Sequence, residues 1–316
     1  MTTSSVAIII LNWNNAPDTL VCLRSLEKLQ YPNCQLFVVD NGSTDNSVAA
    51  LRQAFPSVTI LETGKNLGYA GGNNVGIRHA LDCGSEYVCI LNNDVTVAPD
   101  FLNSLLALFA AEENLGVTCP LIAEMNDPET IWALGASVRQ GKGDTIRHYE
   151  GERVSAFRNA SALEVQVAPG TAMLIKREVF GKVGLLDESF FLYYEETDWC
   201  LKVRRAGYRI LAVPASVVWH KVSSTLGQTS PVIDYYMLRN QLLFTSHHWS
   251  GLALLGVQGR IVLRNVATIM AYTVHSHSGQ RQPHRNARLL ALRDAILGRW
   301  GKMGLDVQAV CYPAKR

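Results

Sequence analysis

The sequence lacks the features that define several protein classes. No two of its seven cysteines have CxxC spacing, and an odd number of scattered cysteines in a 316-residue chain argues against a disulfide framework. We therefore expect reduced thiols, as in the cytosol. The 29 Lys and Arg residues are nearly balanced by 27 Asp and Glu, so the net charge of +2 gives no reason to expect nucleic-acid binding.

Long apolar runs are also scarce. The first five residues carry no basic segment, and the apolar run Val6–Leu11 is too short for the core of a signal peptide. Residues 251–274 form the best membrane-spanning candidate, but Arg260 and Arg264 interrupt it, which leaves no apolar stretch of about 20 residues. We expect a soluble, cytoplasmic chain. The sequence does not exclude contact with a membrane surface.

The amino-acid composition is that of a globular protein. Hydrophobic residues make up 48% of the chain and charged residues 18%, which excludes a disordered, collagen-like or coiled-coil chain. Charge is unevenly distributed, because residues 250–316 hold ten Lys or Arg and two Asp, a local charge of +8, against −6 for residues 1–249. We therefore predict two parts, an acidic body, 1–249, and a basic helical extension, 250–316.

Apolar runs alternate with helical stretches through the first part of the chain. The expected strands are 6–11, 36–40, 58–61 and 87–91, and the expected helices are 18–29, 45–55, 70–82 and 99–111. Nearly continuous apolar strands that alternate with helices indicate an α/β fold with a parallel sheet covered on both faces. The pattern loosens between 117 and 167, as in a loop-rich insertion or a mixed part of the sheet. It then resumes with strands at 172–175, 208–213 and 217–219 and helices at 177–182, 195–206 and 233–248.

Polar residues follow three of these strands. The segments are Asn12-Trp13-Asn14, Asp40-Asn41-Gly42-Ser43 and Asn92-Asn93-Asp94. In an open α/β sheet ligands bind outside the carboxyl ends of the strands, so we expect these residues to share a ligand-binding edge. An ordinary turn explains Gly42 well. It explains Asp40 less well, because that carboxylate still lies on the strand and can accept an N–H from a nucleobase.

Asp94 and its neighbours favour a hard cation. One carboxylate together with phosphate and water oxygens is enough to bind Mg²⁺. The competing interpretation is a turn, which Asn and Asp also favour. His220 follows the apolar segment 217–219, and a lone histidine in such a place is more often a structural residue than a metal ligand.

Two further segments are informative only in combination with the others. The glycine- and asparagine-rich segment 66–74 either brings backbone N–H groups close to a ligand or forms an ordinary turn. It matches neither the dinucleotide-binding fingerprint nor the Walker A motif. The segment 195–198 opens a helix with three carboxylates, which are often only partners of the helix dipole. The aromatic run 190–194 before it would raise the pKa of a nearby carboxyl, which suits a general base.

Taken in order, these segments resemble the family 2 glycosyltransferases, which are inverting enzymes of GT-A fold, and most closely their rhamnosyltransferase-like bacterial branch. The resemblance spans residues 6–245 and rests on Ile9–Asn14, Val38–Asp45, Asn66-Leu67-Gly68 with Gly72-Asn73, Leu91–Asp94, Gly170–Met173 with Gly184–Glu188, Tyr194–Leu201, Arg205–Tyr208 and Trp219-His220. It implies a GT-A catalytic domain over 1–249, with a Rossmann-like, mostly parallel sheet, helices on both faces, a donor half to residue 120 and an acceptor half beyond it.

The resemblance also implies roles for residues that bind the donor and a metal. Asp40 matches the residue that reads the uracil or thymine ring. Asp94 matches the last acid of the family's Asp-x-Asp metal motif, whose first acid is here replaced by Asn92, and His220 matches a position that completes the metal site. The cofactor implied is Mg²⁺ or Mn²⁺. The remaining matches on the donor side are Asn12, Asn66, Gly72, Asn73, Asn92 and Asn93.

On the acceptor side, Glu196 matches the second acid of the pair assigned as general base, where the family often has Asp. Thr171, Glu195 and Trp199 match the surroundings of the acceptor. These residue types fit the chemistry, since the attacking hydroxyl needs a base on the face opposite the leaving diphosphate. A single inverting displacement needs no enzyme nucleophile, which agrees with the lack of any Ser or Cys triad pattern.

The function implied is transfer of a sugar, most simply rhamnose from dTDP-rhamnose, to a glycan or lipid-linked glycan in surface polysaccharide synthesis. A nucleotidyltransferase would be expected to carry a glycine-rich, basic loop after the first strand, which 12–18 lack. A non-catalytic sugar-nucleotide or glycan-binding module would not need Asp94, Glu196 and His220 together. The extension 250–316 either holds the enzyme at the anionic inner face of the cytoplasmic membrane or packs on the catalytic domain.

Overall fold

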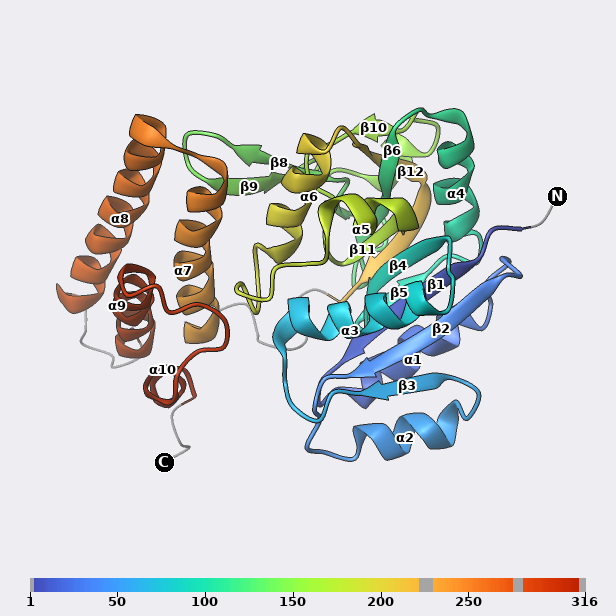
Figure 1. Cartoon of the computed structure of the whole chain (residues 1–316), viewed down its shortest axis with the longest axis horizontal. Helices are drawn as coiled ribbons and strands as arrows, with labels where there is room; N and C mark the ends of the chain where they lie inside the picture. The colour runs from blue at the N-terminus through green and yellow to red at the C-terminus, as the bar shows by residue number, and fades with distance from the viewer. Residues whose placement is uncertain (1–2, 222–229, 275–280, 313–316) are drawn as a thin grey trace.

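The computed structural model describes residues 3–221, 230–274 and 281–312, and it combines a large mixed sheet with a helical bundle (Figure 1). The parallel half of the sheet has the spatial order β4-β1-β2-β3. Its strands are β1 Val6–Asn12, β2 Cys34–Asp40, β3 Thr59–Glu62 and β4 Tyr87–Asn92. The strands predicted at 6–11, 36–40, 58–61 and 87–91 are therefore confirmed.

Helices cover both faces of this sheet, because successive strand residues point to opposite sides. In β1, Ile9 belongs to one hydrophobic core, whereas Ile8 and Ile10 belong to the other. The helices on the face of Ile9 are α3 Gly68–Asp82, α5 Arg177–Val183 and α6 Glu195–Arg205. Those on the face of Ile8 are α1 Ala16–Leu26, α2 Ser47–Ala54 and α4 Phe101–Ala111.

The second half of the sheet is mixed. β11 (Ala172–Lys176) runs antiparallel to both β4 and β6 (Leu115–Glu124), and β6 pairs in parallel with β12 (Arg209–His220). β12 is one strand where the sequence predicts two segments, and its register with β6 breaks between Val213 and Val217. Short elements complete this half: β5 Val95–Val97, β7 Ile131–Ala133, the hairpin of β8 Ala136–Arg139 and β9 Asp144–Arg147, a 3-10 turn at Val154–Phe157, and β10 Leu163–Glu164.

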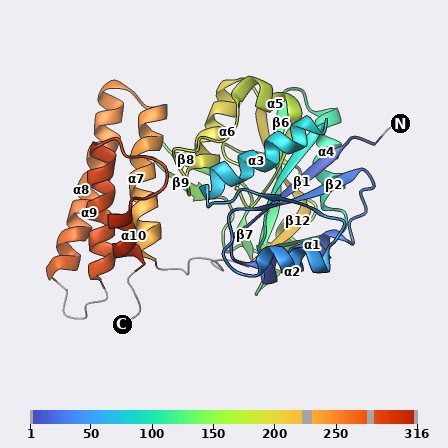
Figure 2. The same ribbon diagram turned by 60° about the horizontal axis from the view of Figure 1, so that its bottom comes forward.

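The C-terminal helices form a bundle beside the sheet (Figure 2). They are α7 Pro231–His248, α8 Gly251–Val274, α9 Gln282–Ile296 and α10 Leu305–Cys311. Tyr235 and Tyr236 of α7 share a hydrophobic core with residues of the other three helices, while Phe244 of α7 belongs to the core under the sheet. α7 thus packs on both parts, and the boundary at residue 249 stays a prediction. All seven cysteines are free.

Among the described residues, α8 is the one helix long and apolar enough to cross a membrane by length and composition. Its most apolar window of 18 residues has a mean hydropathy of 1.3, and 22% of that window is buried. Val257, Ile261 and Asn265 form its buried face. The opposite side of the helix is exposed and apolar, a feature that bears on the membrane question below.

Candidate active site

Asp40 at the end of β2 is fixed by two neighbours. Asn12 Nδ2 donates to Asp40 Oδ1 at 2.9 Å, the Ser43 hydroxyl donates to the same oxygen at 2.6 Å, and the Ser43 N–H donates to Oδ2 at 3.0 Å. Parallel pairing of β1 with β2 sets Asn12 directly beside Asp40. Asn12 is fully buried, and its Oδ1 accepts from the Thr19 hydroxyl at 2.8 Å. In this structure Asn12 therefore orients Asp40 at the ligand-binding edge.

The turn into α3 is tied to the end of β2. Asn66 Oδ1 accepts from the N–H of Gly68 at 2.8 Å. Asn41 Oδ1 accepts from the N–H of Leu67 at 2.9 Å, and Asn41 Nδ2 donates to Gly68 O at 3.0 Å. These bonds place Asn66, predicted on the donor side, next to the turn that carries Asp40.

Gly72 and Asn73 lie inside the protein, beneath that turn. A Cβ on Gly72 would come within 2.4 Å of Leu11 Cδ1, so glycine lets α3 pack directly on β1. Asn73 is fully buried and donates to Tyr69 O at 3.0 Å. Both residues, predicted on the donor side, support α3 in this structure.

Asp94 and His220 meet at the edge of the sheet that was predicted to bind ligands. His220 Nε2 lies 3.2 Å from Asp94 Oδ1, and about a tenth of each side chain is exposed. The antiparallel pairing of β5 with β12 sets His220 opposite Val95, directly beside Asp94. A carboxylate oxygen and an imidazole nitrogen that converge in this way are both ligands that divalent metals accept.

The chain around this pair is held by hydrogen bonds of Asn92, Asn93 and Thr171. The N–H of Asn92 donates to Thr171 O at 2.9 Å, which joins β4 to the start of β11. Asn93 Nδ2 donates to the Thr19 hydroxyl at 3.0 Å. Thr171 itself is buried. The residues predicted for donor and acceptor thus come together around the end of β4.

The Glu195–Glu196 pair begins α6 beside this edge. Glu195 is buried, and its Oε2 has no hydrogen-bond partner within the described part of the chain. Glu196 is partly exposed, and its Oε1 accepts from the Thr197 hydroxyl at 3.2 Å. A Cβ added at Gly170 would lie 2.9 Å from the Tyr69 hydroxyl and 3.4 Å from Glu196 Cγ, so Tyr69 and Glu196 flank the same glycine.

The electrostatics of this region favour a proton acceptor. Removal from water raises the pKa of Glu196, and burial followed by the charge of Glu196 raises the pKa of Glu195 well above its usual value. Burial also raises the pKa of Tyr69, and the charges of Glu195, Glu196 and Asp94 add to the rise. The pKa of Tyr69 therefore responds to the acid pair on α6 and to the carboxylate after β4. The Tyr69 hydroxyl donates a hydrogen bond to Gly170 O at 2.5 Å.

Trp199, predicted near the acceptor, is 1% exposed and lies in the core. Its indole N–H donates to Gly184 O at 2.9 Å, and its ring packs against Phe180 at 5.5 Å between centroids. In this structure Trp199 fixes α6 against α5 from the side away from solvent.

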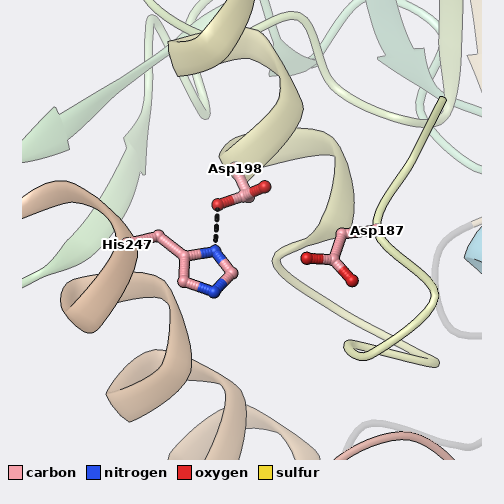
Figure 3. A group of neighbouring side chains, drawn as sticks. All are labelled: Asp187, Asp198 and His247. Atoms are coloured by element: carbon pink, nitrogen blue, oxygen red, sulfur yellow. Dashed lines mark hydrogen bonds and ion pairs between the residues drawn. The ribbon is translucent and has the colours of Figure 1, made fainter. Parts of the chain in front are cut away.

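Asp187, Asp198 and His247 form a second group whose ligand atoms lie within 4.8 Å of one another, the spacing of a metal site (Figure 3). Asp198 is already engaged, because Oδ1 accepts from His247 Nδ1 at 2.9 Å and from His248 Nε2 at 2.8 Å. Lys202 Nζ lies 2.6 Å from its Oδ2. An ammonium on the second oxygen opposes a cation there, so the contacts favour a structural link between α6 and α7.

A surface hollow of about 780 Å³ lies at the other end of β4. Its lining includes Arg78, Tyr87, Lys176 and Arg177 and none of the predicted site residues. Since Tyr87 begins β4 and Asp94 follows its end, the hollow is remote from the carboxylates and histidine described above.

Two residues of the site were missed in the sequence. Tyr69 lies within the segment 66–74, which predicted only backbone contacts, and Gly170 precedes the predicted Thr171. Gly170 opens the matched segment Gly170–Met173, but neither residue was predicted to have a role of its own. They become recognisable only when α3, β11 and α6 meet.

The mostly parallel sheet, the helices on both faces and the carboxylates after its strands agree with the predicted GT-A fold. A family model described as "Glycosyl transferase family 2" matches residues 7–184, which is more than half of the chain. The protein therefore belongs to that family. The predicted fold class and enzyme class are confirmed.

Curated relatives include rhamnosyltransferases. The chain is 26% identical over 248 residues to "dTDP-rhamnosyl transferase RfbF" of Shigella flexneri, covering 76% of this chain and 79% of the relative. It is 29% identical over 244 residues to "N-acetylglucosaminyl-diphospho-decaprenol L-rhamnosyltransferase" of Mycobacterium tuberculosis, covering 71% and 78%. These similarities agree with the predicted branch of the family.

Solved structures share the fold. The mannosyltransferase PcManGT of Pyrobaculum calidifontis, in complex with GDP-Man and Mn²⁺, superposes with a TM-score of 0.57 at 17% identity, covering 95% of this chain and 88% of that chain. GalNAc-T7 with UDP, GalNAc and Mn²⁺ gives 0.60 at 14% identity, covering 98% and 58%. At such identities the likeness establishes the architecture alone.

Proposed function

We propose that the protein transfers a sugar with inversion from a nucleotide-sugar donor, dTDP-rhamnose in the first instance, to a glycan or lipid-linked glycan acceptor. The observation that carries this proposal is the convergence of Asp94 with His220, beside an acid pair held in a poorly solvated environment. The names of the rhamnosyltransferase relatives support the donor, and the decaprenol-linked substrate in one of them supports a lipid-linked acceptor.

The residues fit a divalent cation. Asp94 Oδ1 and His220 Nε2 lie 3.2 Å apart and converge on one region of the ligand-binding edge. His220 Nδ1 is buried without a hydrogen-bond partner among the described residues, while Nε2 faces Asp94 and the ring packs edge-on against Trp132 at 4.9 Å between centroids. Mn²⁺ accepts both imidazole and carboxylate ligands, and Mg²⁺ prefers oxygen. A bound cation would neutralise charge on the leaving diphosphate.

The protein's own residues supply the remaining steps. Asp40, oriented by Asn12 and Ser43, is placed to accept an N–H from the donor's pyrimidine ring. Glu196 accepts the proton of the attacking acceptor hydroxyl, which a carboxylate with a raised pKa does effectively near neutral pH. No covalent enzyme intermediate is needed, because one displacement inverts the anomeric carbon.

We also propose that α8 holds the enzyme at a membrane surface. Leu252, Leu255, Leu263, Met270 and Val274 are all exposed on this helix, and Leu252 is 87% exposed. Arg260, which interrupts the apolar sequence, reaches the body of the protein and donates to Gly141 O at 2.9 Å. An exposed apolar stripe in a segment of local charge +8 suits an interfacial helix on anionic lipid. The inner face of the cytoplasmic membrane would give access to a lipid-linked acceptor.

A donor panel tests the central proposal. The full-length protein is incubated with dTDP-rhamnose, UDP-GlcNAc or GDP-mannose, a polyprenyl-diphosphate-linked acceptor and Mn²⁺ or Mg²⁺, and both nucleoside diphosphate and product are measured. We expect metal-dependent release with dTDP-rhamnose that requires the acceptor. Asp94→Asn serves as the inactive control.

Two results would contradict this proposal. Binding of donors without turnover under all conditions would favour the non-catalytic module, and release of inorganic diphosphate from a nucleoside triphosphate would favour a nucleotidyltransferase.

A further inference from the structure

The loop before the acid pair has an unusual backbone. Phe191, Tyr193 and Tyr194 have φ angles of 64°, 68° and 76°, in the left-handed region that residues other than glycine rarely adopt. Such conformations persist only where the surroundings hold them, and they cluster at functional sites. Tyr194 is also the N-cap residue of α6 and directly precedes Glu195. The contacts that hold this loop, residues 190–194, therefore set the positions of both glutamates.

Asn240 of α7 holds the loop from one side. Its side chain is fully buried, and Nδ2 lies 2.8 Å from Phe190 O, 2.7 Å from Leu192 O and 2.9 Å from Tyr193 O. An amide has two N–H groups, so the three carbonyl oxygens share both of them. The carbonyls converge on one nitrogen because the loop curls around Asn240.

Arg239 orients Asn240. Its guanidinium donates to Asn240 Oδ1 at 3.0 Å from Nε and 2.9 Å from an Nη, which fixes the amide with its N–H groups toward the loop. A further Nη–H donates to Phe190 O at 3.2 Å. A single guanidinium thus contacts the loop directly and also fixes the residue that binds it.

Arg239 connects the loop to the C-terminal helices as well. It donates to Gly301 O at 2.8 Å and to the Tyr235 hydroxyl at 3.3 Å, and that hydroxyl donates to Asp294 of α9 at 2.7 Å. The buried cation lies 4.9 Å from the ring centre of Tyr236 and 6.0 Å from that of Trp300. Residues of α7 and of the segment before α10 therefore contact this one charge, and the Tyr235 hydroxyl links it to α9.

The start of α3 holds the loop from the other side. The N–H of Tyr69 donates to Phe191 O at 2.6 Å. A Cβ on Gly68 would come within 2.3 Å of that same oxygen, so only glycine allows this approach. Tyr69 is also the residue whose hydroxyl borders Glu196 at Gly170.

We propose that Arg239 and Asn240 are positioning residues for glycosyl transfer, which act by holding the loop 190–194 and thereby placing Glu196. The C-terminal helices that Arg239 links to this loop then belong to the catalytic unit. This inference rests on the proposed role of Glu196 as the base. It assigns a task to a fully buried pair of residues outside the predicted site.

Asn240→Asp tests the inference in the full-length protein, because it removes both N–H donors at nearly constant volume. Gln241→Ala is the matched control. Gln241 is the next residue of α7, is also buried, and donates to Lys142 O at 3.0 Å and Gly143 O at 3.3 Å, away from the loop. Arg239→Lys keeps the charge but loses the forked contact with Asn240. Each variant is measured for kcat, for donor KM, for dTDP binding with Mn²⁺ and for melting temperature.

We expect Asn240→Asp to lower kcat by about 10²-fold and Arg239→Lys by about tenfold, with donor KM and dTDP affinity within about twofold of the wild type. Gln241→Ala should lower only the melting temperature. Equal loss of kcat in the Asn240 and Gln241 variants, or a loss of dTDP binding that parallels kcat, would overturn the inference.

Glu196→Gln, assayed beside these variants, separates the two levels of failure. If it is inactive while Asn240→Asp and Arg239→Lys turn over at the wild-type rate, the inference is wrong and the base assignment stands. If Glu196→Gln turns over normally, the base assignment is wrong and the inference falls with it.

Discussion

His220 Nε2 at the end of β12 lies 3.2 Å from Asp94 Oδ1, although the two residues belong to different halves of the sheet. The short strand β5 explains the contact, because its pairing with β12 sets His220 opposite Val95. The N–H of Lys221 then donates to Asp94 O at 2.9 Å and closes the same corner. Backbone pairing thus places both side chains at the same corner of the sheet.

Replacement of His220 should weaken metal binding. His220→Asn removes the imidazole ligand, and we expect Mn²⁺ affinity to fall by at least about 10- to 100-fold, the range seen when the surroundings of a metal site are disrupted. Mn²⁺ binding followed by electron paramagnetic resonance measures this directly. His148→Asn is the control, because His148 bonds to Ser137 outside the site. Unchanged Mn²⁺ affinity in the His220 variant would remove His220 from the metal site.

Replacement of the base should stop turnover without loss of donor binding. Glu196→Gln keeps the size of the side chain but cannot take a proton, so kcat should fall by about 10²-fold or more. Glu178→Gln on α5, an exposed acid paired with Lys176, is the matched control. Normal turnover of Glu196→Gln would direct attention to Glu195, since both oxygens of Asp198 are engaged elsewhere.

The pH profile of kcat should carry the signature of Glu196. Removal from water raises the pKa of Glu196, and a base works only when ionised, so activity should fall with decreasing pH at a midpoint above the ordinary glutamate pKa of about 4.3. The charge of Glu196 in turn adds to the raised pKa of its titratable neighbours, Glu195, Tyr69, Tyr193, Tyr194 and Cys200. The residual activity of Glu196→Gln should lack this limb. A limb that persists unchanged in that variant would belong to another group.

Asp198 should stabilise the protein in a pH-dependent way. Burial alone would raise its pKa, but hydrogen bonds from His247 and His248 and the ammonium of Lys202 outweigh burial and hold the pKa well below its usual value. A depressed pKa adds stability that is fully present above the unfolded pKa of about 3.9 and is lost as the pH falls below it. We expect Asp198→Asn to cost about 1–3 kcal/mol at pH 7, from thermal unfolding, and less at pH 3.

The same measurement decides whether the group in Figure 3 binds a metal. Asp198→Asn and the wild type should gain the same stabilisation from Mn²⁺ if Asp198 is structural. Stabilisation by Mn²⁺ that disappears in this variant would instead make Asp187, Asp198 and His247 a second metal site.

The apolar face of α8 should bind lipid. Serine in place of Leu255, Leu263 and Met270 should reduce sedimentation of the full-length protein with anionic vesicles at least tenfold, because a fully buried side chain of this size contributes about 1.5–3 kcal/mol. High salt should release the wild type in part, and neutral vesicles should bind it less. Ile146→Ser, which changes an exposed apolar side chain on β9 rather than on α8, is the control. Equal sedimentation of all variants would leave α8 as a structural helix only.

Much of the fold was predictable because the secondary structure of its first half depends on short stretches of sequence. Apolar strands and the helices between them each follow from a short stretch of sequence, and parallel strands place the residues after them at one edge. Asp40 and Asp94 were found in this way. β6 was less predictable, because Pro120 lies inside it and cannot donate to the strand ladder. The weak pattern there concealed a strand that is buried along most of its length.

The sequence by itself determined the alternating strands and helices, the family, and the acidic and amide residues that follow the strands, since each depends on residues close together in the chain. Only the tertiary structure decided that pairing of β5 with β12 brings His220 beside Asp94, that Trp199 is buried, and that Asn240 holds the loop before Glu196. Each of these relationships depends on strand register or on packing between helices distant in sequence. Hydrophobic periodicity tells which face of an element is buried, but it does not tell what that face meets.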